Sequence, residues 1–466
     1  MPPPSPSRRK PAPRTAPRTA PRTAPPTPAL TPAQLAVPLL LLFSLLRLLP
    51  PPSSHPAASL LSSPAFRLPP SFPSFEIDAL QAAAQEQPPQ PPLLLLFYSL
   101  LPAPVLNLLC DLLTCLSLHL LCKTLPSLSP FERGLDAKMH PSIAAPPLLP
   151  PAPLPPLPVL VPLAYFCFPF PLVSCQLPSS QPLFHALLSG ALSLSSLGHL
   201  PPAMLCLSLA AYLGLWPAAL LLPLSLALKA ANPGPGQRRV PLLAALAFAL
   251  FSLSLYLLSA RSVRDRAWPK AAYGPRLSFS DLTPSAGLYW YLFSEMFDRF
   301  QSFFAIVLTA LPYTLVAPVT YRLRRFPLAA AASLVGLFGL LEPSPTLATF
   351  AFSAAVMACD ARVLARLRFV SVFCGVAMWV PVSLMFLDLH LWLQTGAGNA
   401  NYFYFQQLAY SVFTGLIVLD WLRAAVNRLK AVSITEKEEA ERARERKRER
   451  KEKQKEEKKR RAAVID

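Results

Sequence analysis

Charged residues are scarce in most of this 466-residue chain, which excludes an ordinary soluble domain. Only 14% of the residues are Asp, Glu, Lys or Arg, whereas soluble proteins carry about a quarter. The charges that are present concentrate near the two ends and in short clusters, and they are sparse from Leu35 to about Ala431. Because 53% of the residues are hydrophobic, we predict that most of the chain lies in a membrane.

The chain also lacks the common motifs of metal, nucleotide and nucleophile chemistry. None of the eight cysteines forms a Cys-x-x-Cys pair, and all lie in or beside apolar segments, where cysteine behaves as a small hydrophobe. There is no Gly-rich phosphate loop, no Asn-x-Ser/Thr acceptor, and no arguable Ser/His/Asp or Cys/His arrangement. His119 and His185 lie in apolar runs and are interpreted as core histidines. We therefore expect no metal, no cofactor and no catalytic residue.

The net charge of +19 does not indicate nucleic-acid binding. Such binding needs a basic surface on a folded module with aromatic side chains for base stacking. The basic C-terminal tail, from Ser433 onward, contains no aromatic residue at all.

Composition divides the chain into three parts. Residues 1–34 repeat Ala-Pro-Arg-Thr and hold too little apolar surface to fold, so they are expected to be a disordered arm; an organelle transit peptide is the alternative. Residues 35–430 are expected to be an all-α, multi-span membrane domain. Residues 431–466 carry Glu and Lys/Arg at many i,i+4 spacings and are predicted to be a charged cytosolic helix beginning at the capping box Ser433-Ile-Thr-Glu436.

Apolar runs within the membrane domain predict about ten to twelve transmembrane helices. The short run Leu35–Leu49, which carries Arg47, is either a first span or a signal anchor. The other candidates are 93–121 with Asp111 inside it, 144–157 as a re-entrant piece or a span, 159–173, 182–200, 204–228, 240–259, 287–321 as a tilted or broken helix, 327–341, 346–358, 369–393 and 402–422.

Basic clusters set the expected orientation, because cytosolic loops carry an excess of Lys and Arg. The clusters lie at 8–22, 123–138, 238–239, 322–325, 362–368 and from 423 onward. The loops 50–92, 260–286 and 394–401 are then expected to face the lumen. Four basic residues between Arg261 and Lys270 oppose this assignment and are interpreted as interfacial side chains.

A glycine- and asparagine-rich loop near the luminal boundary is the best candidate for binding. In the loop Gly396-Ala-Gly-Asn-Ala-Asn, the glycines allow a tight turn, and Asn399 and Asn401 offer uncharged amide donors and acceptors. These groups suit the phosphates and sugar hydroxyls of a glycolipid. The simpler interpretation, which composition alone favours, is an ordinary turn between two helices.

Two segments resemble a known family. Asp281-Leu-Thr-Pro284, Gly287-Leu-Tyr-Trp290 and Glu295-Met-Phe297 are similar to the signature of PIG-U, a membrane subunit of the glycosylphosphatidylinositol (GPI) transamidase. The loop Gly396–Tyr404 resembles the Gly-x-x-Asn-x-Asn-aromatic loop of the same family. The resemblance is good over about 275–425 and weaker at 93–122.

The resemblance implies roles for particular residues. Asn399 and Asn401 stand at the positions that hold the GPI lipid, and Arg322 and Arg324, with Arg238 and Arg239 by a looser match, stand where phospholipid headgroups bind. Glu295 and Asp298 are three residues apart and are expected on one helix face, either paired with a partner subunit or hydrated. Asp281 and Thr283 before Pro284 predict a helix N-cap.

The resemblance implies an endoplasmic reticulum membrane protein without catalytic residues of its own. It would present the GPI anchor to an acyl-enzyme formed by a separate Cys/His subunit, and its partners would be the other transamidase subunits, the GPI glycolipid and membrane phospholipids.

The alternative is a multi-span GPI mannosyltransferase that uses a dolichol-linked sugar, with Glu76 and Asp78 as catalytic carboxylates in the first luminal loop. A lipid scramblase would need ionisable groups through the bilayer centre, where few exist.

Overall fold

The computed structural model describes residues 32–48, 91–99, 102–125, 156–176, 179–263, 267–280, 282, 284–343, 345–393 and 395–462. These residues form helices and connecting turns, and no strand occurs among them. The predicted all-α class is therefore confirmed. Most of the arm 1–34, the carboxylates Glu76 and Asp78, and residues 144–155 of the candidate span 144–157 lie outside the described residues.

The first half of the bundle contains eight helices among the described residues. They are α1 (Pro32–Leu48), α4 (Pro92–Tyr98), α5 (Ala103–Thr124), α7 (Leu157–Cys167), α8 (Pro169–Gln176), α9 (Gln181–Leu197), α10 (Leu200–Gly214) and, after the 3-10 helix η2 (Trp216–Leu220), α11 (Leu221–Ala231). Helix α1 begins at Pro32 rather than at Leu35.

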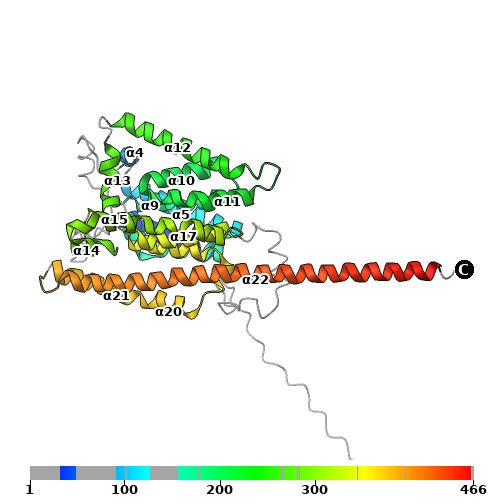
Figure 1. The fold of residues 1–466 in the computed structure, drawn as a ribbon. Coiled ribbons are helices and arrows are strands. Elements are labelled where there is room, and N and C mark those ends of the chain that lie inside the picture. Colours follow the sequence, from blue (N-terminus) through cyan, green and yellow to red (C-terminus); the bar gives the residue numbers. More distant parts are fainter. Residues whose placement is uncertain are drawn as a thin grey trace, which may run out of the picture.

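The second half continues from α12 to the C-terminal helix α22 (Figure 1). Its elements are α12 (Val240–Ser262), α13 (Trp268–Ser278), α14 (Tyr289–Ser294), α15 (Asp298–Thr314), α16 (Val316–Arg322), α17 (Pro327–Leu341), α18 (Leu347–Ala358), α19 (Ala361–Leu364), α20 (Phe369–Ala377), α21 (Trp379–Leu393) and α22 (Ala400–Ala462).

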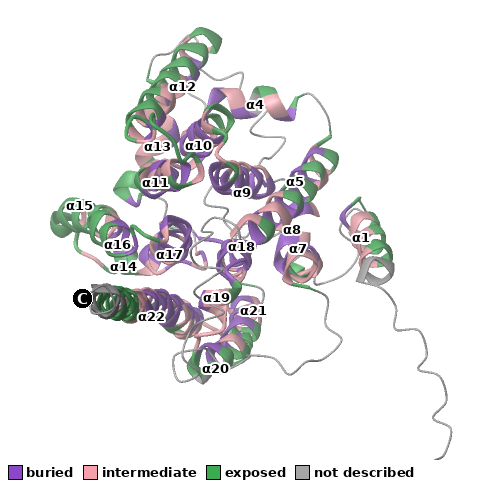
Figure 2. Ribbon diagram, turned by 90° about the vertical axis from the view of Figure 1, so that its right-hand side faces the viewer, coloured by how far each residue is buried: buried purple, intermediate pink, exposed green. Residues whose placement is uncertain are grey.

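Several of these helices fit a multi-pass membrane protein. Among the described residues, five stretches are long and apolar enough to cross a bilayer: α5, α12, α15 with α16, α20 with α21, and α22. The pair α7 and α8, bent by 53°, makes a sixth if it is one span. Shorter apolar helices, α17 and α18 among them, lie beside these. On α12 and α15, leucine and phenylalanine side chains are widely exposed (Figure 2), as expected for helices that face lipid.

The predicted span 204–228 is wrong, because this segment folds into two helices. Leu215 has a positive φ of 58° between α10 and η2, and Pro217 follows it, so α10 cannot continue. The Asn232 Nδ2 at the end of α11 donates to the Gly198 carbonyl just before α10, at 3.0 Å. Helix α10 therefore starts where α11 ends, and the two are antiparallel.

Helices α17 and α18 match the predicted hairpin 327–341 and 346–358. Helix α17 is buried around most of its circumference, and it lies at the centre of the bundle with α18 and α9 (Figure 2). The α18 helix begins with a capping box, in which the Thr346 Oγ1 accepts from the Thr349 backbone N–H at 3.1 Å. In the turn between them, Pro343 and Pro345 lie close to Gly287.

The C-terminal tail does not begin a new helix at Ser433. Helix α22 runs without a break from Ala400 to Ala462, and the Ser433 hydroxyl donates backward to the Lys430 carbonyl at 2.8 Å instead of capping a helix start. Good helix-forming residues on both sides of Ser433 explain this continuity. The described exposed part of the tail projects beyond the bundle (Figure 1).

A buried ion pair lies inside the first half of the bundle. Arg47 donates through Nε to the Asp111 Oδ2 at 2.8 Å, and the side chains of both are almost fully buried. The guanidinium also stacks over the Phe166 ring, 3.8 Å from its centroid. The Tyr165 hydroxyl links Asp111 to the Nδ1 of His185 at 3.0 Å. These contacts join α1, α5, α7 and α9.

Candidate functional site

Two segments that are far apart in the sequence meet at one end of the bundle. The Trp290 Nε1 donates to the Gln407 Oε1 at 2.9 Å, and both side chains are buried. The Trp290 ring also lies near the rings of Trp392, Phe403 and Tyr404. The aromatic contacts join α14 to the start of α22, so the predicted motif around 287–290 and the loop 396–404 form one structural unit.

Asn401 is held within this unit by Tyr291. The Tyr291 hydroxyl donates to the Asn401 Oδ1, and the Tyr291 ring stacks on Tyr404 with centroids 4.4 Å apart. The Tyr404 hydroxyl in turn donates to the Leu288 carbonyl at 3.3 Å. Sequence reasoning assigned no role to Tyr291, and the pairing follows only from the packing of α14 on α22.

Asn399 is the N-cap of α22. Its Oδ1 accepts from the backbone N–H groups of Asn401 at 3.0 Å and of Tyr402 at 3.2 Å. This satisfies donors that a helix N-terminus otherwise leaves unpaired. The Asn399 carbonyl therefore has the structural role that an ordinary turn between two helices would give it.

The glycines shape the loop as predicted. Gly396 has a φ of +67°, a conformation that favours glycine. A Cβ on Gly398 would lie 3.0 Å from the backbone nitrogen of Trp392, so only glycine fits this close approach without displacement. The Leu391 carbonyl accepts from the N–H groups of Ala397 and Gly398, which fixes the loop to the end of α21.

The two asparagines consequently present donors outward. Both carbonyl oxygens are used inside the protein, whereas neither Nδ2 bonds to another residue in the described part of the chain. Both side chains are exposed. Four N–H bonds on two neighbouring amides suit oxygen-rich acceptors such as phosphate or sugar hydroxyls. The asparagine pair thus offers mainly donors, whereas the sequence suggested both donors and acceptors.

Gly287 of the motif packs against the turn between α17 and α18. A Cβ there would lie 2.6 Å from the Pro345 Cδ and 2.9 Å from the Pro343 carbonyl oxygen. The Gly287 N–H donates to the Ser285 Oγ at 3.1 Å, and Pro284 is half-buried. Asp281 and Thr283, and with them the predicted N-cap, lie outside the described residues.

The expectation that Glu295 and Asp298 share a helix face is wrong. Helix α14 ends at Ser294 and α15 begins at Asp298, with Phe297 in an extended conformation at ψ 134°. Both carboxylates are exposed, and the Asp298 Oδ1 accepts from the Gln301 Nε2 at 3.3 Å. The acidic residue Asp298 therefore stands in the first turn of α15, where a negative charge is favourable.

The four arginines predicted to contact phospholipid are exposed: Arg238, Arg239, Arg322 and Arg324. The first two are in the turn between α11 and α12, on the side from which the tail projects (Figure 1). The Arg324 guanidinium lies 4.9 Å from the centroid of the Tyr321 ring. The neighbouring Arg325 pairs with Glu436 of α22 at 2.7 Å.

A family model described as the GPI transamidase subunit PIG-U matches residues 86–410. This range contains both the 281–298 segment and the Asn399–Asn401 loop, and it covers more than half of the chain. The chain belongs to the PIG-U family.

Curated relatives carry names of the same kind. A GPI transamidase component GAB1 homolog of Schizosaccharomyces pombe is 30% identical over 221 residues, which are 47% of this chain and 52% of the relative. The component GAB1 of Saccharomyces cerevisiae is 28% identical over 261 residues, or 55% and 64%. The human GPI-anchor transamidase component PIGU is 28% identical over 291 residues, or 58% and 64%. The chain thus spans between half and two thirds of the length of these relatives.

Several residues of the PIG-U site could not be found by sequence reasoning. Gln407 gave no signal, and the contact of Pro343 and Pro345 with Gly287 was not predicted, because both depend on long-range packing. The Arg47–Asp111 pair gave a partial signal, since each is an isolated charge in an apolar run. A cluster of three or more His, Cys, Asp or Glu residues that could hold a metal is absent from the described ranges.

Proposed function

We propose that this chain is a GPI transamidase subunit of the endoplasmic reticulum membrane that binds the GPI glycolipid and presents it for attachment to protein C-termini. Its partners are the other transamidase subunits, including a peptidase-like subunit with the catalytic Cys/His pair. The proposal is supported by the family match and by the names of the relatives. In this account the chain itself does no bond-breaking chemistry.

The observation that carries the binding role is the outward pair of amide nitrogens on Asn399 and Asn401. Tyr291 and the start of α22 hold the two carbonyls, so the amide planes are fixed before any ligand arrives. Fixed donors bind with a smaller loss of side-chain entropy than mobile ones. In this account the two amide nitrogens donate hydrogen bonds to the phosphate and sugar oxygens of the glycolipid, while its acyl chains lie among the apolar helices.

Positioning is sufficient for such a subunit to contribute to the rate of transfer. Holding a nucleophile in the correct geometry can supply a large part of catalysis without any acid or base. The ethanolamine amine of the bound glycolipid would be presented to the acyl-enzyme of the partner subunit. Arg322, Arg324, Arg238 and Arg239 would bind phospholipid headgroups at the cytosolic end.

The discriminating experiment replaces each asparagine by aspartate. Asp keeps the carbonyl-type acceptor that caps α22 or receives the Tyr291 hydroxyl, but it replaces the donor nitrogen by a charged oxygen. We expect cells that carry only the double variant Asn399→Asp and Asn401→Asp to display far less GPI-anchored protein at the surface. Co-purification of the other subunits should remain at the wild-type level. Unchanged surface display would remove the binding role from this loop.

The mannosyltransferase alternative depends on Glu76 and Asp78, which lie outside the described residues, and no observation favours it. It predicts loss of function in Glu76→Gln and Asp78→Asn, whereas the proposed role predicts wild-type attachment in both.

A further inference from the structure

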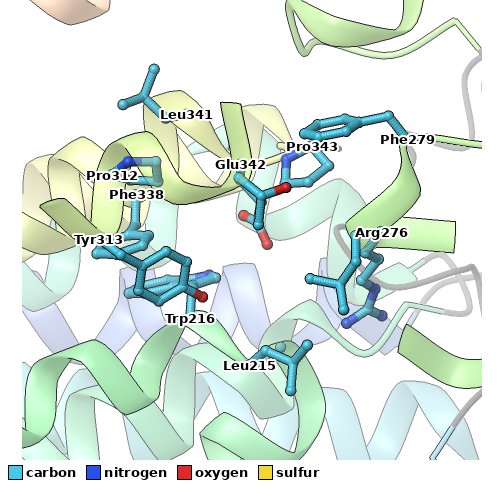
Figure 3. A pocket seen from close by; sticks show the side chains of 13 residues that line it. Leu215, Trp216, Arg276, Phe279, Pro312, Tyr313, Phe338, Leu341, Glu342 and Pro343 are labelled. Atoms are coloured by element: carbon cyan, nitrogen blue, oxygen red, sulfur yellow. The ribbon is translucent and has the colours of Figure 1, made fainter. Parts of the chain in front are cut away.

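A cavity lies beside the motif, and no residue of the asparagine loop lines it. It is formed by the turn from α10 to η2, the end of α13, the C-terminal part of α15 and the end of α17 (Figure 3). The space between its atoms is about 570 Å³, including its open mouth. Pro343 lines the cavity and also packs near Gly287, so the cavity shares a wall with the site described above.

One wall of this cavity is aromatic. The Trp216 ring stacks on Phe338 with centroids 5.2 Å apart and an interplanar angle of 8°, and Tyr313 meets Phe338 edge-on at 5.1 Å. Figure 3 shows these three rings gathered on one side and Arg276 on the other, with Glu342 between them. A largely apolar cavity with a few polar groups is typical of a small-molecule or lipid site.

Two buried donors at this cavity lack acceptors. Trp216 is 5% exposed, and its Nε1 has no hydrogen-bond partner among the described residues. The Thr309 Oγ1, on α15, is also buried without one in this part of the chain. Buried polar atoms are nearly always hydrogen-bonded, because an unmade bond costs about 1–3 kcal/mol. Both residues line the cavity, so an acceptor bound there is one way to satisfy the two donors.

Charges of both signs line the same cavity. Burial lowers the pKa of Arg276 to about 10, so its guanidinium is still charged at neutral pH, and one of its N–H groups donates to the Leu213 carbonyl at 2.6 Å. Glu342 is 7% exposed, and its carboxylate acts electrostatically on Arg276. The donors suit phosphate oxygens, whereas the carboxylate suits a cation and disfavours a purely anionic ligand.

We propose that this cavity binds a phosphoethanolamine group of a membrane lipid. The phosphate oxygens accept from Trp216, Thr309 and Arg276, and the primary ammonium donates to Glu342 near the aromatic wall, where a cation is also favourable. A choline headgroup has no N–H to donate to Glu342, and a glycerol headgroup has no cation. The group is carried both by phosphatidylethanolamine and by a GPI glycolipid with its terminal ethanolamine. The inference does not depend on the asparagine pair.

The test measures lipid retention by the purified, intact complex that contains this chain. Native mass spectrometry is carried out after exchange into detergent supplemented with one lipid: phosphatidylethanolamine, phosphatidylcholine, phosphatidylglycerol or purified GPI. The variant Trp216→Phe with Thr309→Val removes both unpaired donors, keeps an aromatic ring to stack on Phe338 and keeps the side-chain volume at residue 309. The variant Glu342→Gln removes only the charge.

We expect the wild-type complex to retain more phosphatidylethanolamine than phosphatidylcholine or phosphatidylglycerol. In each variant, the fraction of complexes that retain the ethanolamine lipid at this site should be at least fivefold lower. Glu342→Gln should at the same time retain more phosphatidylglycerol. The variant Asn399→Asp with Asn401→Asp should retain phosphatidylethanolamine as the wild type does, which separates this inference from the proposed function.

The experiments with phosphatidylethanolamine and with GPI are compared to identify the lipid that carries the headgroup. If the variants lose only phosphatidylethanolamine, the cavity binds a structural phospholipid. If they also lose GPI, the cavity is a second binding site for the glycolipid. Equal retention of all lipids by the wild type would overturn the inference. It would also be overturned if both variants, with unfolding temperatures like the wild type, lost neither lipid.

Discussion

At the residue scale, Asn399 and Asn401 each use the carbonyl oxygen for a structural contact and leave the amide nitrogen without a partner in the described part of the chain. The Asn399 Oδ1 caps α22 and the Asn401 Oδ1 receives the Tyr291 hydroxyl, while the nitrogens point outward. Sequence reasoning treated a structural turn and a binding loop as alternatives. The two interpretations are compatible, because the contact made by each carbonyl oxygen also orients the amide nitrogen of the same side chain.

Gly287 provides a prediction at the residue scale. Gly287→Ala places a Cβ 2.6 Å from the Pro345 Cδ, in a turn whose proline rings cannot move aside easily. Overpacking of this kind typically costs about 1–3 kcal/mol. We expect a lower unfolding temperature of the detergent-solubilised protein. The control Gly236→Ala, where no atom lies within 4 Å of the new Cβ, should unfold at the wild-type temperature. Equal stability of the two variants would contradict the packing described here.

At the scale of elements, apolar length predicted some helices well and their breaks poorly. The run 327–341 coincides with α17 because proline starts it and a polar turn ends it. The run 204–228 was predicted as one span but breaks at Leu215, and the run 287–321, predicted as a tilted or broken helix, is broken at Glu295–Phe297. Breaks of this kind are set by tertiary contacts at the helix ends, such as the Trp290–Gln407 bond, which no local pattern encodes.

Charged residues in apolar runs were informative, although their partners were not predictable. Arg47 and Asp111 are 64 positions apart and meet only after α1 packs on α5. Their mutual neutralisation explains how a charge can be tolerated at this depth. Since both residues are paired and almost fully buried, they do not provide the ionisable pathway through the bilayer that a lipid scramblase would need.

The pair gives a prediction at the element scale. Removal of one partner from a buried ion pair typically costs about 3–5 kcal/mol, whereas replacing both by apolar residues costs much less. We therefore expect Asp111→Leu alone to lower the unfolding temperature strongly. The double variant Arg47→Met with Asp111→Leu should recover much of the loss. If the double variant is as unstable as the sum of the single variants, α1 is not held by this pair.

The whole molecule has two chemically different ends. The turn between α11 and α12, with its exposed arginines, and the projecting part of α22 lie at one end, and α13, α14 and the start of α22 lie at the other (Figure 1). The cavity belongs to this second end, because the end of α13 lines it. By the excess of basic residues in cytosolic loops, the first end should face the cytosol and the second the lumen.

This orientation is testable by cysteine labelling in sealed microsomes. Ala397→Cys and Lys451→Cys place thiols at two exposed positions, one at each end. We expect a membrane-impermeant maleimide to label the second variant in intact vesicles and the first only after the lumen is opened. The wild type, whose eight cysteines are buried or half-buried, serves as the background. The opposite labelling order would reverse the assignment of both ends.

The most direct test of the account as a whole is the amount of GPI retained by the purified complex. Loss of hydrogen bonds to a charged acceptor costs about 1.5–3 kcal/mol each, and every 1.4 kcal/mol is about tenfold in affinity. In native mass spectrometry, the wild-type complex should retain GPI, and the complex with Asn399→Asp and Asn401→Asp should retain at least about tenfold less at equal subunit content. Equal retention by the two complexes would contradict the claim that these amides bind the glycolipid.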